Sequence, residues 1–212
     1  MGERLRDRRD AGQRLAVLLT RYAGDDPLIL ALPRGGVPVG AQIAAHLDAP
    51  LDVLVVRKLG HPRQPELALG ALAEGGVRIL NTGLLRRLGL DAAILDQVTA
   101  REREELERRV AEYRGRRAPA AVTGRTVIVV DDGLATGMTA RAAVESLRDR
   151  HAMRIILAVP VASAATATTL REVADDVVTV LEPVQMQAVN RWYDDFRQVD
   201  DDEVVRLLAE RG

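Results

Sequence analysis

The chain has 212 residues, 47% of them hydrophobic, and its 30 Lys and Arg nearly balance its 31 Asp and Glu. This length suits one α/β domain with an elaboration, or at most two small domains, and the net charge of -1 gives no sign of a nucleic-acid binder's basic face. Because the chain has no cysteine, disulfides, thiolate zinc sites and cysteine nucleophiles are excluded.

Neither the N-terminus nor any apolar run predicts export or membrane insertion. The N-terminus carries charges from residue 3 onward and lacks the apolar core of a signal peptide. The longest apolar run, at 155–162, contains a proline and is too short to span a bilayer. We therefore expect a cytoplasmic protein that contacts neither membranes nor nucleic acid.

The first half of the chain mixes amphipathic and fully apolar segments. Leucines and valines set among arginines near the N-terminus are typical of an amphipathic helix, whereas short apolar runs predict buried strands. A stretch with two prolines and three potential cations predicts a loop, and a Gly-Gly pair predicts a hairpin turn. The expected elements are a helix at 3–22, a strand at 28–32, a helix at 39–47, a strand at 51–57, a loop at 58–66 and a hairpin at 68–80.

The second half begins with one long helix and then alternates strands and helices. Asp91 is a candidate cap for a helix over 91–114, and the charge run REREELERRV predicts a solvated helix face. After a linker at 115–124, almost continuously apolar strands alternate with helices, which predicts a mostly parallel sheet covered by helices on both faces. The expected elements are strands at 126–131, 154–160 and 177–181 and helices at 138–150 and 163–173.

Three of the expected strand ends carry polar residues, at 33–36, 57–63 and 131–139. Ligands of parallel sheets bind outside the carboxyl ends of the strands. These three segments are therefore predicted to form one binding site.

The stretch VIVVDDGLATGMTA at 127–140 places two acids directly after a buried strand. Asp131 and Asp132 repel each other and are costly to bury unless a cation or hydroxyl groups satisfy them. Gly137 and the following helix start offer free backbone N–H groups that suit an anion. A ligand with a phosphate and vicinal hydroxyls, such as ribose 5-phosphate, would satisfy both features. An ordinary strand-to-helix turn with Asp as a cap is the alternative.

This stretch resembles the 5-phosphoribosyl-1-pyrophosphate (PRPP) signature of the type I phosphoribosyltransferases. The resemblance implies that Asp131 and Asp132 hold the ribose hydroxyls. It also implies Mg²⁺ as cofactor, held mainly by the substrate, with water-mediated contacts to the same two acids. The residues that would cradle the 5-phosphate are Ala135, Thr136, Gly137, Met138 and Thr139.

Two further segments resemble working parts of the same family. LPRGGVPVG at 32–40 resembles the pyrophosphate loop, which implies a cis non-proline peptide between Arg34 and Gly35; a plain turn is the alternative. VVRKLGHPRQPELALG at 55–70 resembles the flexible catalytic loop, and a solvated basic loop is the alternative. The implied pyrophosphate contacts are Arg34, Gly35, Gly36, Arg57 and Lys58, and the implied catalytic residues are Arg34, Lys58, His61 and Arg63.

Three of the five aromatic residues fall in NRWYDDF at 190–196. Such a cluster forms either a local hydrophobic patch or a stacking surface for a planar base. The expected base contacts are Val189, Trp192 and Tyr193. Ala135 stands where hypoxanthine-type members of the family have an Asp near the purine ring, which leaves the base unassigned.

The type I resemblance implies a single domain over 1–212. Its core would comprise about 26–80 and 120–181, with a helical insertion at about 81–118. A hood-like segment at about 182–212, together with the N-terminal helix 3–22, would cover the site. A homodimer is a further expectation, because members of the family commonly dimerise.

The predicted function is Mg²⁺-dependent transfer of a phosphoribosyl group from PRPP to a nitrogen of a nucleobase-like acceptor, with release of pyrophosphate. One alternative is a PRPP-sensing regulatory protein that keeps the fold without catalysis. A third interpretation is an unrelated Rossmann-like nucleotide binder, although no G-x-G-x-x-G pattern is present.

Overall fold

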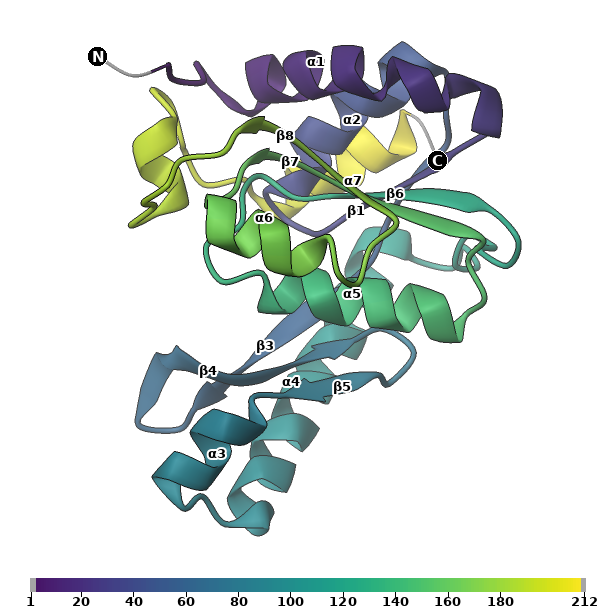
Figure 1. Ribbon diagram of the computed structural model, residues 1–212. Coiled ribbons are helices and arrows are strands. Elements are labelled where there is room, and N and C mark those ends of the chain that lie inside the picture. The colour runs from purple at the N-terminus through teal and green to yellow at the C-terminus, as the bar shows by residue number, and fades with distance from the viewer. Residues whose placement is uncertain (1–2, 211–212) are drawn as a thin grey trace.

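The computed structural model describes residues 3–210, apart from the side chain of Glu66. The chain forms a five-stranded parallel sheet and a separate three-stranded antiparallel sheet (Figure 1). The parallel sheet has the order β2-β1-β6-β7-β8. Its strands are β1 (Leu28–Ala31), β2 (Leu51–Val53), β6 (Thr126–Val130), β7 (Arg154–Val161) and β8 (Asp176–Leu181).

Helices cover both faces of the parallel sheet, as the apolar strands predicted (Figure 1). Ile29 and Ala31 of β1 pack in the cluster on one face, and Leu28 and Leu30 pack in the cluster on the other. The fold class is therefore confirmed as α/β. The first face carries α1 (Arg8–Leu19), followed by a 3-10 turn at Thr20–Asp25, with α2 (Gly36–Leu47) and α7 (Asp201–Ala209); the second face carries α5 (Met138–Asp149) and α6 (Ala164–Leu170).

The loop predicted at 58–66 is wrong, because these residues form an antiparallel hairpin. The strands are β3 (Val56–His61), β4 (Gln64–Ala73) and β5 (Arg78–Leu80), and the β3–β4 register shifts twice between Leu59 and His61. Pro65 lies near the start of β4, outside the part that pairs with β5, so it removes no hydrogen bond from the centre of the sheet. The predicted turn at Gly75-Gly76 is confirmed, with φ angles of 93° and 89°.

The antiparallel sheet lies between α5 and α4 (Ala92–Arg114), beyond the parallel sheet (Figure 1). Leu72 of β4 shares an apolar cluster with Leu106 of α4, while Ala71 packs with Ala142 of α5. Helix α3 (Thr82–Leu88) lies at the far end. Within residues 3–210, no helix combines the length and apolar character needed to cross a bilayer.

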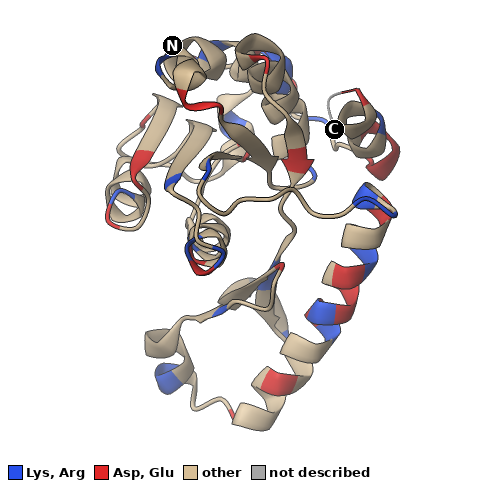
Figure 2. Ribbon diagram, turned by 90° about the vertical axis from the view of Figure 1, so that its right-hand side faces the viewer, with Lys and Arg blue, Asp and Glu red and all other residues tan. Residues whose placement is uncertain are grey.

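Helix α4 begins after the predicted cap, since the Asp91 side chain accepts a hydrogen bond from the Ala93 N–H. Residues of both charge signs alternate along the helix (Figure 2), and those of the charge run at 101–110 are exposed or half-buried, as that run predicted, except at Glu102. Glu102 is only 7% exposed and binds both Arg57 and Arg101. The prediction of a solvated face is therefore wrong at Glu102, whose partner Arg57 lies 45 residues away in the sequence.

The order of the parallel strands creates a switch point between β1 and β6. From β1 the chain moves to β2 on one side, and it later returns to β6 on the other side of β1. In open α/β sheets a crevice for ligands opens outside the carboxyl ends of the two strands at such a point. The candidate site is expected there.

Candidate active site at the β1–β6 strand ends

The segment after β1 lies directly against the end of β6. A Cβ on Gly36 would come within 2.5 Å of the Val130 carbonyl oxygen, and one on Gly35 within 1.9 Å of Oδ2 of Asp132. Only residues without a side chain allow this approach. The structure thus brings the predicted pyrophosphate loop and the predicted ribose acids together at the switch point.

The cis peptide bond lies between Pro33 and Arg34, one bond earlier than predicted. Gly35 already has helical dihedral angles, and the Gly36 N–H donates to the Leu32 carbonyl oxygen at 3.0 Å. The turn into α2 therefore begins at Arg34, and the irregular bond precedes it.

Arg34 extends from this loop toward the C-terminal helix. Its guanidinium lies 3.8 Å from Asp201 of α7, and the Tyr113 hydroxyl also donates to Asp201. The Arg34 side chain is 29% exposed, so it keeps access to solvent beside the strand ends. A cation in this position can attract an anionic ligand without a tight internal partner to displace.

The two acids sit in a setting that favours their neutral forms. Burial and the neighbouring charge of Asp132 raise the pKa of Asp131 well above its ordinary value. Burial also raises the pKa of Asp132, and the Arg8 guanidinium opposes that rise. Oδ1 of Asp131 accepts the Asp132 N–H at 2.8 Å. Ligand hydroxyls or a cation would relieve this cost.

The loop that follows the acids has a backbone geometry that suits an anion. Gly137 has a φ of 71° and begins α5 without a side-chain cap, so the first-turn N–H groups are left for a ligand. Thr166 supports the loop from behind, because its hydroxyl donates to the Ala135 carbonyl oxygen at 3.0 Å. Thr136, Gly137 and Met138 line an open cavity of about 440 Å³. This loop can bind a phosphate group through its backbone.

The hairpin residues predicted to clamp pyrophosphate separate into two groups. Arg57 donates to Glu102 of α4 at 3.0 and 2.8 Å, so its guanidinium faces away from the site and its predicted role is corrected. Lys58, the next residue in β3, projects from the opposite face, the one packed toward α5. His61 and Arg63 lie at the hairpin tip, where the His61 Nδ1 accepts the Arg63 N–H.

The structure distinguishes the three predicted base contacts. Val189 lies against Gly133, the residue after the acid pair, since a Cβ on Gly133 would meet its side chain at 2.5 Å. Trp192 is half-buried beside a small apolar cluster. Tyr193 is only 2% exposed, and its hydroxyl donates to the Asp132 carbonyl oxygen at 2.7 Å. Tyr193 therefore supports Asp132 from the interior, which corrects its prediction as a stacking surface.

Sequence reasoning missed Arg8, which binds the Asp132 carboxylate from α1. Five arginines lie between residues 4 and 14, and no local pattern distinguishes Arg8 from the others. Its partner is 124 residues away in the sequence. Only the packing of α1 over the strand ends identifies it.

The residues present suit a divalent cation held mostly by a substrate. Among residues 3–210, no group of three or more His, Asp and Glu side chains lies close enough to hold a metal ion. Mg²⁺ commonly uses one or two carboxylates together with substrate phosphates and water. Asp131 and Asp132 at the strand ends can supply those carboxylates.

The close approach of Gly35 to Asp132 predicts a sharp effect of one methyl group. We expect Gly35→Ala to displace the Asp132 carboxylate and to weaken PRPP binding by about tenfold, equivalent to about 1.4 kcal/mol. A calorimetric titration with PRPP and Mg²⁺ measures this. Gly24→Ala is the matched control, because no atom lies within 4 Å of its new Cβ. Equal affinities in the two variants would contradict the packing described for Gly35.

Comparison with known proteins agrees with this geometry. The sequence model described as "Phosphoribosyl transferase domain" matches residues 4–195. Two proteins from strains of Mycobacterium tuberculosis, both named "Putative phosphoribosyl transferase", are 47% identical over 202 residues. That alignment covers 95% of this chain but 46% of each relative, so the chain spans about half their length.

The crystal structure of TT1426 from Thermus thermophilus has the same fold along its whole length. It superposes with a TM-score of 0.83 at 42% identity, covering 98% of this chain and 99% of the other. These matches exclude the interpretation of the chain as an unrelated Rossmann-like nucleotide binder. The chain belongs to the phosphoribosyl transferase domain family, in agreement with the acid pair and the predicted phosphate loop at the end of β6.

Proposed function

We propose that this domain transfers the phosphoribosyl group of PRPP to a nitrogen of a nucleobase-like acceptor and releases pyrophosphate. The observation that carries the proposal is the meeting of the Asp131–Asp132 pair with the Gly35–Gly36 turn at the sheet's switch point. PRPP has three parts, and the site offers a feature for each. The acid pair suits the ribose hydroxyls, the loop after the acids suits the 5-phosphate, and the glycine turn suits the pyrophosphate.

Each part of the site has a proposed role in this reaction. Asp131 and Asp132 hold the ribose hydroxyls, and the backbone of 135–139 holds the 5-phosphate. Arg34, with the N–H groups of Gly35 and Gly36, binds the leaving pyrophosphate. Lys58 adds charge from the antiparallel sheet, and His61 and Arg63 at the hairpin tip approach when substrate is bound. Such positioning and charge stabilisation can supply most of the acceleration.

Mg²⁺, when bound with PRPP, would neutralise charge that develops on the pyrophosphate. The protein's own contribution is to orient the ribose so that its C1 faces the acceptor side of the site. Val189 and Trp192 are the proposed acceptor contacts. Residues 182–212 with the N-terminal helix form the proposed hood over the site, and 81–118 the proposed insertion. A nucleobase-like acceptor and a homodimer stay predictions.

The second candidate, a PRPP sensor without catalysis, is favoured by one observation. Arg57, predicted to contact pyrophosphate, is held by Glu102 instead. A sensor needs the ribose and phosphate contacts but has less need of a clamp for the leaving group. Both candidates share the same PRPP-binding residues, so binding alone does not separate them.

A pyrophosphate-release assay with a panel of purine and pyrimidine bases tests the proposal. With PRPP and Mg²⁺ present, we expect at least one base to cause release above the base-free rate. Binding of PRPP without release for any base would favour the sensor. Absence of PRPP binding would contradict both candidates.

A further inference from the structure

Arg8 is held at the ribose acids by three separate contacts. Its Nε donates to Oδ2 of Asp132 at 2.9 Å, and its Nη2 lies 2.8 Å from the same oxygen in an ion pair. Its Nη1 donates to the Arg197 carbonyl oxygen at 2.6 Å, and its guanidinium carbon lies 3.9 Å from the centre of the Phe196 ring. The side chain is only 11% exposed. These contacts fix the guanidinium far more tightly than a surface ion pair would.

The same contacts leave the two oxygens of Asp132 in different states. Oδ2 is enclosed by Arg8 on one side and by the backbone of Gly35 on the other. Among the residues that the structure describes, Oδ1 accepts no hydrogen bond, and it is not sealed from solvent. Oδ1 is therefore the oxygen left for a ligand.

The backbone of Asp132 is held by Tyr193, whose ring packs against the Phe196 ring that contacts Arg8. The Tyr193 hydroxyl donates to the Asp132 carbonyl oxygen at 2.7 Å. The Tyr193 and Phe196 rings lie 4.9 Å apart between their centres. Arg8 of α1 thus holds the side chain of Asp132, and Tyr193 holds its backbone. Phe196 contacts both Arg8 and Tyr193.

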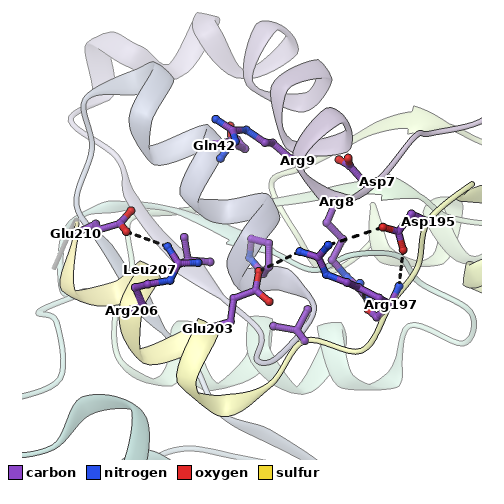
Figure 3. A pocket seen from close by; sticks show the side chains of 12 residues that line it. Asp7, Arg8, Arg9, Gln42, Asp195, Arg197, Glu203, Arg206, Leu207 and Glu210 are labelled. Carbon is purple, nitrogen blue, oxygen red and sulfur yellow. Dashed lines mark hydrogen bonds and ion pairs between the residues drawn. The ribbon is translucent and has the colours of Figure 1, made fainter.

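A cavity of about 460 Å³ lies on the outer side of Arg8, between α1, α2, α7 and residues 195–199 (Figure 3). Its charged side chains largely pair with one another: Arg206 lies 3.1 Å from Glu210, and Arg197 lies 4.0 Å from Glu203. The close carboxylate partner of Arg8 is Asp132, on the side of the strand ends.

Arg8 also carries the positive charge that opposes the repulsion between the two acids. Its guanidinium lowers the pKa of Asp131 and of Asp132, against the burial that raises both. An ionised carboxylate accepts a shorter and stronger hydrogen bond from a hydroxyl than a neutral one does. Geometry and charge therefore assign Arg8 the same task.

We propose that Arg8 is the positioning residue of the ribose site: it holds Oδ2 of Asp132 so that Oδ1 faces a ribose hydroxyl. This inference rests on the proposed binding of PRPP. It extends the ribose site to α1 and to the segment at 193–197, which act through Asp132.

Arg8→Met tests the proposal, because it keeps an unbranched apolar stem and removes the charge and the hydrogen-bond donors. Calorimetric titration with PRPP and Mg²⁺ is expected to show affinity at least about tenfold weaker than wild type. Arg8→Lys keeps the charge but loses the planar fork and the stacking on Phe196, so it should fall between the two. Arg9→Met is the matched control on the same helix, exposed and away from Asp132, and it should bind like wild type.

Rescue by the conservative variant separates positioning from a merely structural role. If the Arg8 guanidinium positions Asp132, PRPP affinity should fall in the order wild type, Arg8→Lys, Arg8→Met. The melting temperature of each variant without ligand shows whether it is folded at the temperature of the titration. A change in fold stability alone would lower the melting temperature without lowering the affinity of the folded protein.

The outcomes separate this inference from the proposed function. If wild type binds PRPP and folded Arg8→Met binds equally well, Arg8 is not a positioning residue. If wild type does not bind PRPP, the proposed function is wrong, and this inference, which rests on it, is wrong as well. Weaker binding in folded Arg8→Met, intermediate binding in Arg8→Lys and wild-type binding in Arg9→Met support the inference.

Discussion

Asp131→Asn combined with Asp132→Asn is expected to abolish the stabilisation of the fold by PRPP and Mg²⁺. At a PRPP concentration of 100 times Kd, wild type should gain about 2.7 kcal/mol, which raises the melting temperature of a chain this long by about 5–10 °C. Asn keeps the shape of Asp but replaces the carboxylate, which would accept hydrogen bonds from the ribose hydroxyls, with a neutral amide. Thermal unfolding with and without PRPP measures the difference.

Single and control variants show whether loss of binding reflects loss of folding. The folded state raises the pKa of Asp131 above 3.8, so wild type loses stability as the pH rises from that value through the raised pKa. Asp131→Asn removes this term and, without ligand at pH 8, should be at least as stable as wild type. Asp149→Asn, exposed at the opposite end of α5, should keep the full PRPP shift. A PRPP shift of wild-type size in the double variant would contradict the ribose assignment.

Arg114→Met is expected to lower the free energy of unfolding by about 3–5 kcal/mol, because it leaves buried acids without their partner. Arg114 is 6% exposed at the end of α4 and bridges Asp52 of β2 and Glu74 after β4. It also donates to the Val53 carbonyl oxygen at 2.9 Å. This side chain ties α4 and the antiparallel sheet to the parallel sheet, and denaturant unfolding measures its contribution.

Two comparisons show whether the unpaired acids cause the loss. Arg116→Met changes an exposed arginine two residues away and should cost less than about 0.5 kcal/mol. Adding Asp52→Asn and Glu74→Gln to Arg114→Met should recover part of the stability, since neutral amides cost less to bury than charges. Similar losses for Arg114→Met and Arg116→Met would show that the buried bridge contributes little.

The parallel sheet and its loaded strand ends were predictable because their signals are local. The runs at 28–32 and 127–130 are apolar on both faces, which is typical of strands covered by helices. The acids and glycines that follow them are too costly or too specialised for ordinary turns. Strand order was not predicted, yet it places these two ends side by side.

The antiparallel hairpin was missed because Pro62, Pro65 and three cations made its tip resemble a loop. Prolines are tolerated there, since Pro62 lies in the turn and Pro65 lies outside the pairing with β5. The resemblance to the pyrophosphate loop placed the cis peptide one bond too late, and the start of α2 at Gly36 was also not expected.

Side-chain pairs between distant segments could not be predicted from the sequence. Arg57 resembled a phosphate contact, and Glu102 resembled one more charge in a solvated run. Their pairing depends on α4 crossing the antiparallel sheet, which no local pattern encodes. Arg8 was missed and Tyr193 was assigned another role for the same reason, because each contacts Asp132 from a distant segment.

Calorimetric titration of the wild-type chain with PRPP in the presence of Mg²⁺ tests the central claim most directly. We expect saturable binding of one PRPP per chain, tighter than binding of ribose 5-phosphate, because the pyrophosphate adds contacts at residues 34–36. ATP should bind more weakly than PRPP. Absence of PRPP binding, or equal affinity for PRPP and ATP, would contradict the assignment of the strand-end site.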